Sequence, residues 1–212
     1  MKTLLVLGGS GLVGAQIVAA ALADPNVGRV VAPTRRPLAR QAKLQNPTVD
    51  FARLPRNVRW WAADAMLCAL GTTRRQAGSA TAFRQIDHDY VIAAARLARS
   101  AGTPVFVYNS SLGANAAARS LYLRVKGETE RDLAGLGFAS LTHVRPSLLD
   151  GGPRRDFRPT EAAGLVFARV LAPIVPRRYR AVSTRAVAAT MLRAALDPQP
   201  GTRVIESEAL RD

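Results

Sequence analysis

Tyr122 and Lys126 stand four residues apart in a segment with helical periodicity, which places both side chains on one face of the predicted helix. Two serines, Ser110 and Ser111, precede them at the end of a predicted strand. A nearby ammonium group stabilises a phenolate and brings the pKa of a tyrosine towards neutrality, and a serine hydroxyl can polarise a carbonyl oxygen. These residue types predict proton transfer during hydride transfer to a carbonyl. A surface helix carrying an ordinary Tyr and Lys is the alternative.

A glycine-rich loop joins the predicted strand Thr3–Leu7 to an apolar helix. Glycines at such a turn permit unusual backbone angles, let a pyrophosphate approach the backbone, and allow the helix to pack closely on the strand. The candidate cofactor contacts in this loop are Gly8, Ser10, Gly11, Leu12, Val13 and Gly14. Ser10 is a phosphate neighbour and not a nucleophile, because the loop does not match the nucleophile elbow GxSxG. A purely structural turn is the alternative.

The residues after the second predicted strand indicate which dinucleotide the loop would bind. An NAD-binding fold of this kind carries an acidic residue about 20 residues past the glycines. Thr34-Arg35-Arg36 stands there instead. Guanidinium groups suit a 2′-phosphate through charge-assisted, bidentate hydrogen bonds. We therefore expect NADP(H) to be preferred, with NAD(H) as the second cofactor. Two solvated arginines in an arginine-rich chain are the alternative.

Strands and helices alternate along the sequence. The predicted strands are Thr3–Leu7, Arg29–Ala32, Val49–Phe51, Ala65–Leu70, Pro104–Tyr108, Ser140–Val144 and Arg203–Glu206. The predicted helices are Leu12–Ala23, Ala80–Ser100, Leu121–Leu136 and Thr184–Leu196. Right-handed crossovers place helices on both faces of a parallel sheet. The expected fold class is therefore α/β, a doubly wound, mostly parallel Rossmann sheet, and the length of 212 residues predicts one domain over 1–212.

The segment of about residues 150–182 differs in composition from the rest of the chain. It contains Gly151-Gly152-Pro153, several arginines and an apolar stretch from Ala162 to Val175. An apolar helix beside guanidinium groups predicts a lid on the substrate side of the sheet. A solvated loop over a packed helix is one alternative, and a weak peripheral contact with anionic lipid is another.

The net charge of +15 first suggests a polyanion as partner. The cations are scattered in singles and pairs without a nucleic-acid-binding motif, so we expect no dedicated nucleic-acid binding. No apolar run approaches the ~20 residues of a membrane span. The single Cys68 cannot form an intrachain disulfide, and His88 and His143 are too distant in sequence to predict a metal site. We expect a cytoplasmic, metal-free protein, with His88 as a capping or surface residue.

Several segments resemble the short-chain dehydrogenases/reductases. They are similar to the atypical, epimerase/dehydratase-like members of the Tat-interacting oxidoreductase subgroup, over essentially the whole chain. The resemblance is carried by the glycine loop, CALGTTRRQAGS (Cys68–Ser79), FRQIDHDYV (Phe83–Val91), SSLGA (Ser110–Ala114), YLRVKGETE (Tyr122–Glu130) and RPSLL (Arg145–Leu149).

The resemblance implies a role for each matching residue. Ser111 would be the catalytic serine, Tyr122 the proton donor, and Lys126 the residue that binds the nicotinamide ribose. The remaining implied cofactor contacts are Gly8, Gly11 and Gly14 at the diphosphate, Arg35 at the 2′-phosphate, Asp50 and Phe51 at the adenine, Gly71 and Thr72 at the riboses, and Pro146 and Ser147 at the carboxamide. Asp87 stands where many catalytic members have Asn, which adds negative charge and puts efficient turnover in doubt.

Two functions are consistent with these residues. The first is an NADP(H)-dependent oxidoreductase that acts on a small carbonyl or alcohol as substrate, with the chain as a monomer or homodimer. The second is a dinucleotide-sensing interaction protein with little or no turnover. The complete Ser-Tyr-Lys set favours the enzyme, whereas Asp87 favours the sensor.

Overall fold

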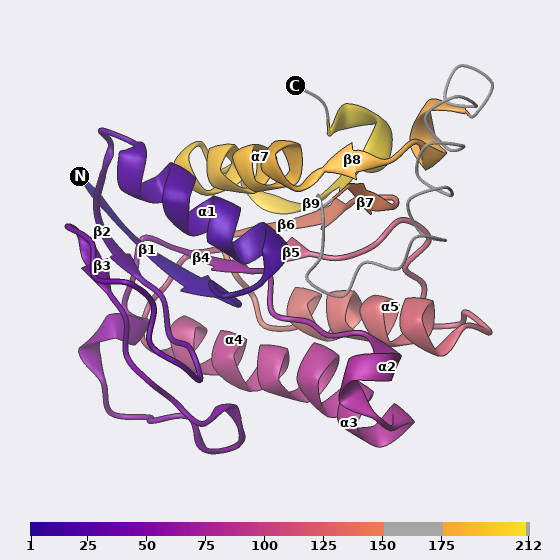
Figure 1. Ribbon diagram of the computed structural model, residues 1–212, viewed down its shortest axis with the longest axis horizontal. Coiled ribbons are helices and arrows are strands. Elements are labelled where there is room, and N and C mark those ends of the chain that lie inside the picture. The colour runs from indigo at the N-terminus through magenta and orange to yellow at the C-terminus, as the bar shows by residue number, and fades with distance from the viewer. Residues whose placement is uncertain (151–175, 211–212) are drawn as a thin grey trace.

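A seven-stranded sheet lies between two layers of helices in the computed structural model, which describes residues 1–150 and 176–210 (Figure 1). The strand order is β3-β2-β1-β4-β5-β6-β9, and every neighbouring pair is parallel. The strands are β1 (Lys2–Leu7), β2 (Val27–Val31), β3 (Leu44–Gln45), β4 (Ala65–Cys68), β5 (Val105–Asn109), β6 (Ser140–Arg145) and β9 (Gly201–Glu206). This arrangement confirms the predicted doubly wound Rossmann fold.

Helices cover both faces of this sheet. In Figure 1, α1 and α7 lie on one side of the strands, and α2 to α5 lie on the other. The helices are α1 (Leu12–Ala23), α2 (Arg74–Ala77), α3 (Ala80–Arg84), α4 (Tyr90–Ser100), α5 (Leu121–Ala134) and α7 (Thr184–Leu196). Helices α1 and α7 pack against each other over one half of the core, as right-handed crossovers require.

The central strands are buried on both faces, so their side chains divide between two cores. On β1, Leu4 and Val6 face the core under α1 and α7, whereas Leu5 and Leu7 face the core under α4 and α5. Successive side chains on a strand point to opposite faces, so a continuous apolar run is what a doubly covered parallel strand needs. This is why the strand is recognisable in the sequence.

Two predicted elements differ from the structure. The short strand expected at Val49–Phe51 is displaced: the edge strand β3 lies at Leu44–Gln45, and Phe51–Arg53 forms a 3-10 turn capped by Asp50. The long helix expected over Ala80–Ser100 is divided into α3 and α4 by one π-helical turn at Gln85–Asp89. Hydrophobic periodicity does not reveal such a turn, because it inserts a single extra residue into a continuous helical pattern.

A second, two-stranded sheet lies beside the main one. It pairs β7 (Leu149–Asp150) in parallel with β8 (Val182–Ser183). These two short strands flank the segment that the sequence predicts as a lid. Residues 151–175 of that segment lie outside the described residues, so the lid stays a prediction.

The order in which the chain adds strands to the sheet reverses between β1 and β4. From β1 the order runs outward through β2 and β3 on one side, and through β4, β5, β6 and β9 on the other. In an open parallel sheet, ligands bind at the carboxyl ends of the strands where this reversal opens a crevice. The candidate site is therefore expected next to the ends of β1, β4 and β5.

Gly14 fixes how closely α1 approaches β1. A Cβ atom at this position would lie 2.0 Å from the carbonyl oxygen of Gly8, far inside van der Waals contact. Gly135, at the end of α5, has an ordinary helical backbone with φ of −72°, and its nearest contact for an added Cβ is 3.5 Å. The two glycines thus differ in whether a methyl group can be accommodated.

We expect Gly14→Ala to lower the free energy of unfolding by about 2 kcal/mol or more, because the helix must move away from the strand to admit the methyl group. Gly135→Ala is the matched control and should be neutral or slightly stabilising. Urea denaturation of both variants measures the difference. Equal stability of the two variants would contradict the close helix–strand contact.

Candidate active site

The glycine loop lies at the end of β1 and packs against the end of β4. Gly8 has φ of +79°, and a Cβ there would lie 2.6 Å from backbone atoms of Ala69 and Leu70. Gly11 is the N-cap of α1 and donates its N–H to the carbonyl of Gly8 at 2.9 Å. Helix α1 has neither a side-chain cap nor an acidic residue in its first turn. Its first amides, including those of Leu12 and Val13, are therefore suited to an anion.

The predicted 2′-phosphate residues lie in the loop that follows β2. Arg35 and Arg36 are exposed, whereas Thr34 beside them is buried. The side chain of Asn46 holds this loop: its Oδ1 accepts from the N–H of Leu38 at 2.7 Å, and its Nδ2 donates to Thr34 Oγ1 at 2.8 Å. Sequence reasoning missed Asn46, because its side chain contacts a different loop and no local motif indicates this.

Asp50 and Phe51, which the family resemblance implies as adenine contacts, lie next to the arginine loop. Thr34 and Thr48 form a parallel β-bridge, and Val49 donates its N–H to the carbonyl of Thr34 at 2.9 Å. Phe51 is buried and stacks on Tyr90 at 6.2 Å between ring centroids. The structure therefore brings the expected adenine-side residues and the arginine pair to one edge of the sheet.

Lys126 is buried against the ends of β4 and β5. Its Nζ lies 3.1 Å from Asp87 Oδ1, 3.2 Å from the Tyr108 hydroxyl oxygen and 3.5 Å from the carbonyl oxygen of Asn109. Burial by itself lowers the pKa of Lys126, and its neighbours Tyr108 and Asp87 more than offset this effect, so its pKa lies above the usual range. Lys126 is therefore a fixed cation under the site.

Asp87 is 1% exposed and lies within the π-helical turn. Its Oδ2 accepts from the N–H of Thr72 at 2.7 Å, while its Oδ1 faces Lys126. A Cβ at Gly71 would lie 3.0 Å from Asp87 Oδ1 and 3.6 Å from Lys126 Nζ. Gly71 and Thr72, predicted from the resemblance as ribose contacts, are thus held directly against the Lys126–Asp87 pair.

The loop that carries Ser111 packs onto the helix that carries Tyr122 and Lys126. Asn115 donates its N–H to the carbonyl of Leu123 at 3.1 Å. Within α5, a Cβ at Gly127 would lie 2.2 Å from the backbone of Asn115, so the loop can close on the helix only over a glycine. Gly127 directly follows the Tyr-x-x-x-Lys motif, but sequence reasoning did not assign it a role.

Tyr122 lies at the start of α5, one turn from Lys126, and is 42% exposed. Its ring contacts Phe83 at a centroid distance of 6.0 Å. The Tyr122 side chain is thus accessible, whereas Lys126, one helical turn later, is buried. Proton transfer to a bound substrate needs an accessible phenol, and a nearby ammonium group favours its phenolate.

Pro146 and Ser147 follow β6 and lie at the same carboxyl edge of the sheet as the segment after β5. Leu112, next to Ser111, donates its N–H to the carbonyl of Pro146 at 2.8 Å. Ser147 donates its N–H to the Ser207 hydroxyl at 3.2 Å, and its own hydroxyl donates to the carbonyl of Arg180. The structure therefore joins the segment after β5 to the segment after β6, as a shared cofactor site would need.

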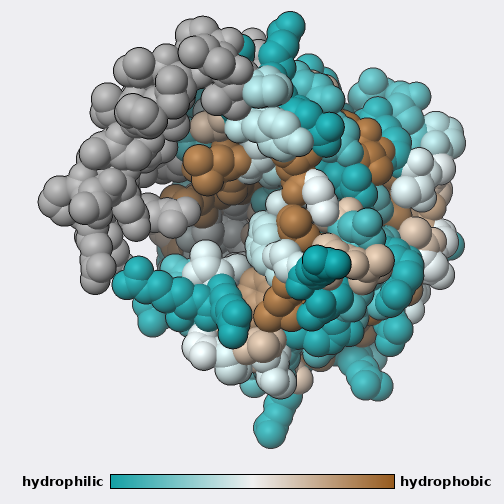
Figure 2. Space-filling model, turned by 90° about the vertical axis from the view of Figure 1, so that its right-hand side faces the viewer, coloured by the Kyte–Doolittle hydropathy of each residue, from teal (hydrophilic) through white to brown (hydrophobic). Residues whose placement is uncertain are grey.

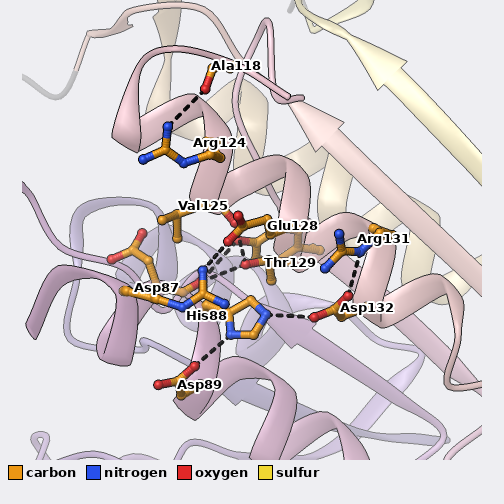
Figure 3. Close-up of polar contacts among 12 residues, drawn as sticks. Asp87, His88, Asp89, Ala118, Arg124, Val125, Glu128, Thr129, Arg131 and Asp132 are labelled. Carbon is orange, nitrogen blue, oxygen red and sulfur yellow. Dashed lines mark hydrogen bonds and ion pairs between the residues drawn. The ribbon is translucent and has the colours of Figure 1, made fainter. Parts of the chain in front are cut away.

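His88 is not the capping or surface residue expected from the sequence. Its side chain is buried between two carboxylates, with Nδ1 2.7 Å from Asp89 and Nε2 2.9 Å from Asp132 (Figure 3). Because carboxylates only accept hydrogen bonds, both contacts are made fully when both ring nitrogens carry a proton. His88 thus connects the π-helical turn to α5, behind the Asp87–Lys126 pair.

The residues at this edge fit a nicotinamide dinucleotide. Gly8 and Gly71 let the glycine loop and the segment after β4 pack closely against neighbouring protein atoms, which brings both segments to the same crevice. Asn109 Oδ1 and Ser110 Oγ are buried and have no hydrogen-bond partner among the described residues. Figure 2 shows the carboxyl edge with hydrophobic residues at its centre and hydrophilic residues around them. A concave, mainly apolar site with a few polar groups is typical of cofactor binding.

Solved structures with the same fold are NAD-binding enzymes. MoeE5 in complex with UDP-glucose and NAD is 18% identical, has a TM-score of 0.72, and is matched over 96% of this chain and 75% of its own. WbmH of Bordetella bronchiseptica in complex with NAD⁺ is 17% identical, with a TM-score of 0.71 over 98% of this chain and 76% of its own. The chain therefore shares its fold with these two NAD-bound proteins.

The sequence relatives are more specific. The mitochondrial protein fmp52 of Emericella nidulans is 34% identical over 184 residues, which cover 82% of this chain and 78% of that protein. The mitochondrial protein fmp52 of Aspergillus fumigatus is 36% identical over 173 residues, covering 77% and 73%. No protein-family model matches the sequence. The chain belongs to the Fmp52 family.

These relatives correct one prediction. The expected cytoplasmic location is contradicted, because the relatives are named as mitochondrial proteins. Within residues 1–150 and 176–210, no helix is long and apolar enough to cross a bilayer. The same residues contain no group of three or more His, Cys, Asp or Glu side chains placed to hold a metal ion.

The His88–Asp132 contact can be tested by a double-mutant cycle with His88→Ala and Asp132→Asn. We expect a coupling energy of about 1–3 kcal/mol in urea denaturation, because the imidazole is buried and bonded to a carboxylate. The cycle with Asp89→Asn is the control and should give less than about 1 kcal/mol, since Asp89 is largely exposed.

The coupling energy between His88 and Asp132 should also depend on pH. Hydrogen bonds from Arg131 and His88 hold the pKa of Asp132 below its usual range. A carboxylate whose pKa is lower in the folded state stabilises the protein fully above its unfolded pKa of about 3.9 and loses this effect as the pH falls. The coupling energy should therefore stay nearly constant from about pH 6 to about pH 4 and decline as the pH is lowered further. A coupling energy that does not decline below about pH 4 would contradict an ionised Asp132 in the contact.

Proposed function

We propose that this protein is an NADP(H)-dependent oxidoreductase that acts on a small carbonyl or alcohol. The observation that supports this function best is an exposed tyrosine one helical turn from a buried, charged lysine, at the same sheet edge as a glycine-rich loop. Bound dinucleotide would supply or accept the hydride. The protein then has to position the substrate and to move one proton, and the candidate site has a group for each task.

Tyr122 would donate the proton to the substrate oxygen during reduction and take it back during oxidation. Lys126 lies beneath it as a fixed cation and favours the phenolate that remains after donation. The Ser111 hydroxyl, at the end of β5, would donate a hydrogen bond to the same substrate oxygen. Its contact with the carbonyl of Leu112, at 3.4 Å, is long and leaves the hydroxyl available for a substrate.

The preference for NADP(H) rests on the arginine loop after β2. Arg35 and Arg36 are exposed there, and Asn46 fixes the loop that carries them. A 2′-phosphate placed beside two guanidinium groups would receive charge-assisted hydrogen bonds that a 2′-hydroxyl cannot. The assignment to the Tat-interacting oxidoreductase subgroup belongs to the same proposal, and its support is the sequence resemblance.

The substrate side of the proposed site is apolar. Leu12, Tyr122 and Leu148 are among the few large apolar side chains left exposed in the described part of the chain, with 43%, 42% and 61% of their surface accessible. All three follow the ends of strands at the carboxyl edge. Exposed apolar groups around a polar centre favour a substrate with a hydrophobic part next to its carbonyl.

A dinucleotide-sensing protein with little turnover is the second candidate. The observation that favours it is Asp87, whose buried carboxylate neutralises the ammonium group that would activate Tyr122. Such a protein would bind the dinucleotide through the same loops, but it would transfer hydride slowly or not at all. Turnover by the wild-type protein therefore decides between the two functions.

Arg35→Glu tests the cofactor preference. Wild-type protein should bind NADPH more tightly than NADH, and the variant should bind NADH more tightly, because the carboxylate repels the phosphate and accepts from the ribose hydroxyl. Isothermal titration calorimetry measures both affinities. Arg96→Glu, an exposed position on α4, is the control and should leave the preference unchanged. Equal affinities of wild-type protein for the two cofactors would remove the NADP assignment.

Tyr122→Phe tests the proton donor. The substitution keeps the ring but removes the transferable proton, so turnover of any accepted carbonyl should fall by about 10²-fold or more with cofactor affinity little changed. Tyr90→Phe, which removes a hydroxyl at the adenine side, is the control and should retain turnover. Unchanged turnover in Tyr122→Phe would show that Tyr122 is not the acid.

A further inference from the structure

We propose that Asp87 raises the affinity of the site for the oxidised form of the dinucleotide relative to the reduced form. This inference rests on the proposed function, because it concerns the cofactor that the site would bind. It goes beyond that function in naming a redox state and the residue that selects it. The charges that decide the preference lie under Gly71 and Thr72.

Lys126 and Asp87 form a buried pair whose net charge is zero. Their side chains are 6% and 1% exposed, and Nζ lies 3.1 Å from Oδ1. The other buried ionisable groups against this pair are neutral: burial raises the pKa of Cys68 to about 12 and raises the pKa of Tyr108 above its usual range. A solvent-shielded pair of this kind is only weakly screened by salt.

The charges further along α5 are compensated separately. Glu128 pairs with Arg84, and Glu130 pairs with Arg145 at 2.6 Å. Desolvation holds the pKa of His143 below its usual value, so this ring is neutral near pH 7. Asp87 is therefore the group that decides whether the charge of Lys126 is balanced.

The two oxygens of Asp87 face two different donor groups. One oxygen faces the ammonium group of Lys126, and the other accepts from the N–H of Thr72 at 2.7 Å. Both neighbours are donors. An asparagine there would satisfy only one of them through its oxygen and would turn its amide N–H₂ towards the other. The chain is thus built around a carboxylate at this point.

The oxidised nicotinamide ring carries one positive charge more than the reduced ring. A cation such as unbalanced Lys126 repels the oxidised ring, whereas the carboxylate of Asp87 cancels this repulsion. In a medium of effective permittivity about 20, one buried unit charge changes the affinity for a nearby cation about tenfold once partial solvation is included. Removing the charge of Asp87 should therefore weaken binding of the oxidised form about tenfold relative to the reduced form.

Asp87→Asn is the direct test, because it removes the charge with little change in volume. Calorimetry would measure the dissociation constants of NADP⁺ and NADPH for the wild-type protein and the variant at one ionic strength. The ratio of the NADP⁺ constant to the NADPH constant should rise about tenfold in Asp87→Asn. A structural change that weakens binding of both forms equally cancels in this ratio, so a merely structural role of Asp87 would not change it.

Asp89→Asn is the matched control. It makes the same substitution two residues later, where the side chain is 55% exposed, so the ratio should change less than about twofold. Thermal unfolding verifies that each variant is folded. Asp87→Ser, whose hydroxyl still accepts from Thr72, replaces Asp87→Asn if that variant does not fold, and the same rise is expected.

The calorimetry results test this inference and the proposed function separately. An unchanged ratio, with both cofactor forms bound by the folded variant, would overturn the role of Asp87 and leave the proposed function standing. A wild-type protein that binds neither NADP(H) nor NAD(H) would overturn the proposed function itself. An equal rise in the Asp89→Asn ratio would assign the effect to net charge and would also overturn the inference.

Discussion

The buried charge of Lys126 is the constraint on which the arrangement of the candidate site depends. An ammonium group removed from water is costly unless it gains an opposite charge and hydrogen-bond acceptors. Here Asp87, the Tyr108 hydroxyl and the Asn109 carbonyl meet this need. These partners come from the π-helical turn and from β5, while Lys126 comes from α5. One cation therefore fixes three elements relative to one another.

Close backbone contacts extend this constraint to the rest of the crevice. Asp87 also accepts a hydrogen bond from the N–H of Thr72, and Gly71 has no side chain to displace the Lys126–Asp87 pair. The β4 end in turn packs against Gly8, and α1 packs on the same loop through Gly14. A side chain at any of these glycines would push two elements apart, so the glycine loop and the lysine are positioned by one connected set of contacts.

The sequence predicts the fold well where side-chain periodicity carries the information, and the site less completely. Apolar runs such as Ala65–Leu70 reveal buried parallel strands because both faces are covered, and the glycine loop reveals the first strand-to-helix turn. The π-helical turn could not be predicted, because the helical pattern runs through it without a break. The role of His88 could not be predicted either, since its partner Asp132 lies 44 residues away. Asn46 and Gly127 were missed for the same reason. Their partners are set by packing and not by local spacing.

Two of the ion pairs of α5 are made with the π-helical turn, and they differ in how far solvent reaches them. On its outer side, His88 joins the π-helical turn to Asp132, where solvent reaches the carboxylates and screens them. On its inner side, Lys126 and Asp87 are shielded and act on whatever lies above Gly71. Both systems begin at adjacent residues of one π-helical turn. Because successive side chains on a helix project in different directions, Asp87 faces Lys126 and Thr72 while its neighbour His88 faces Asp132.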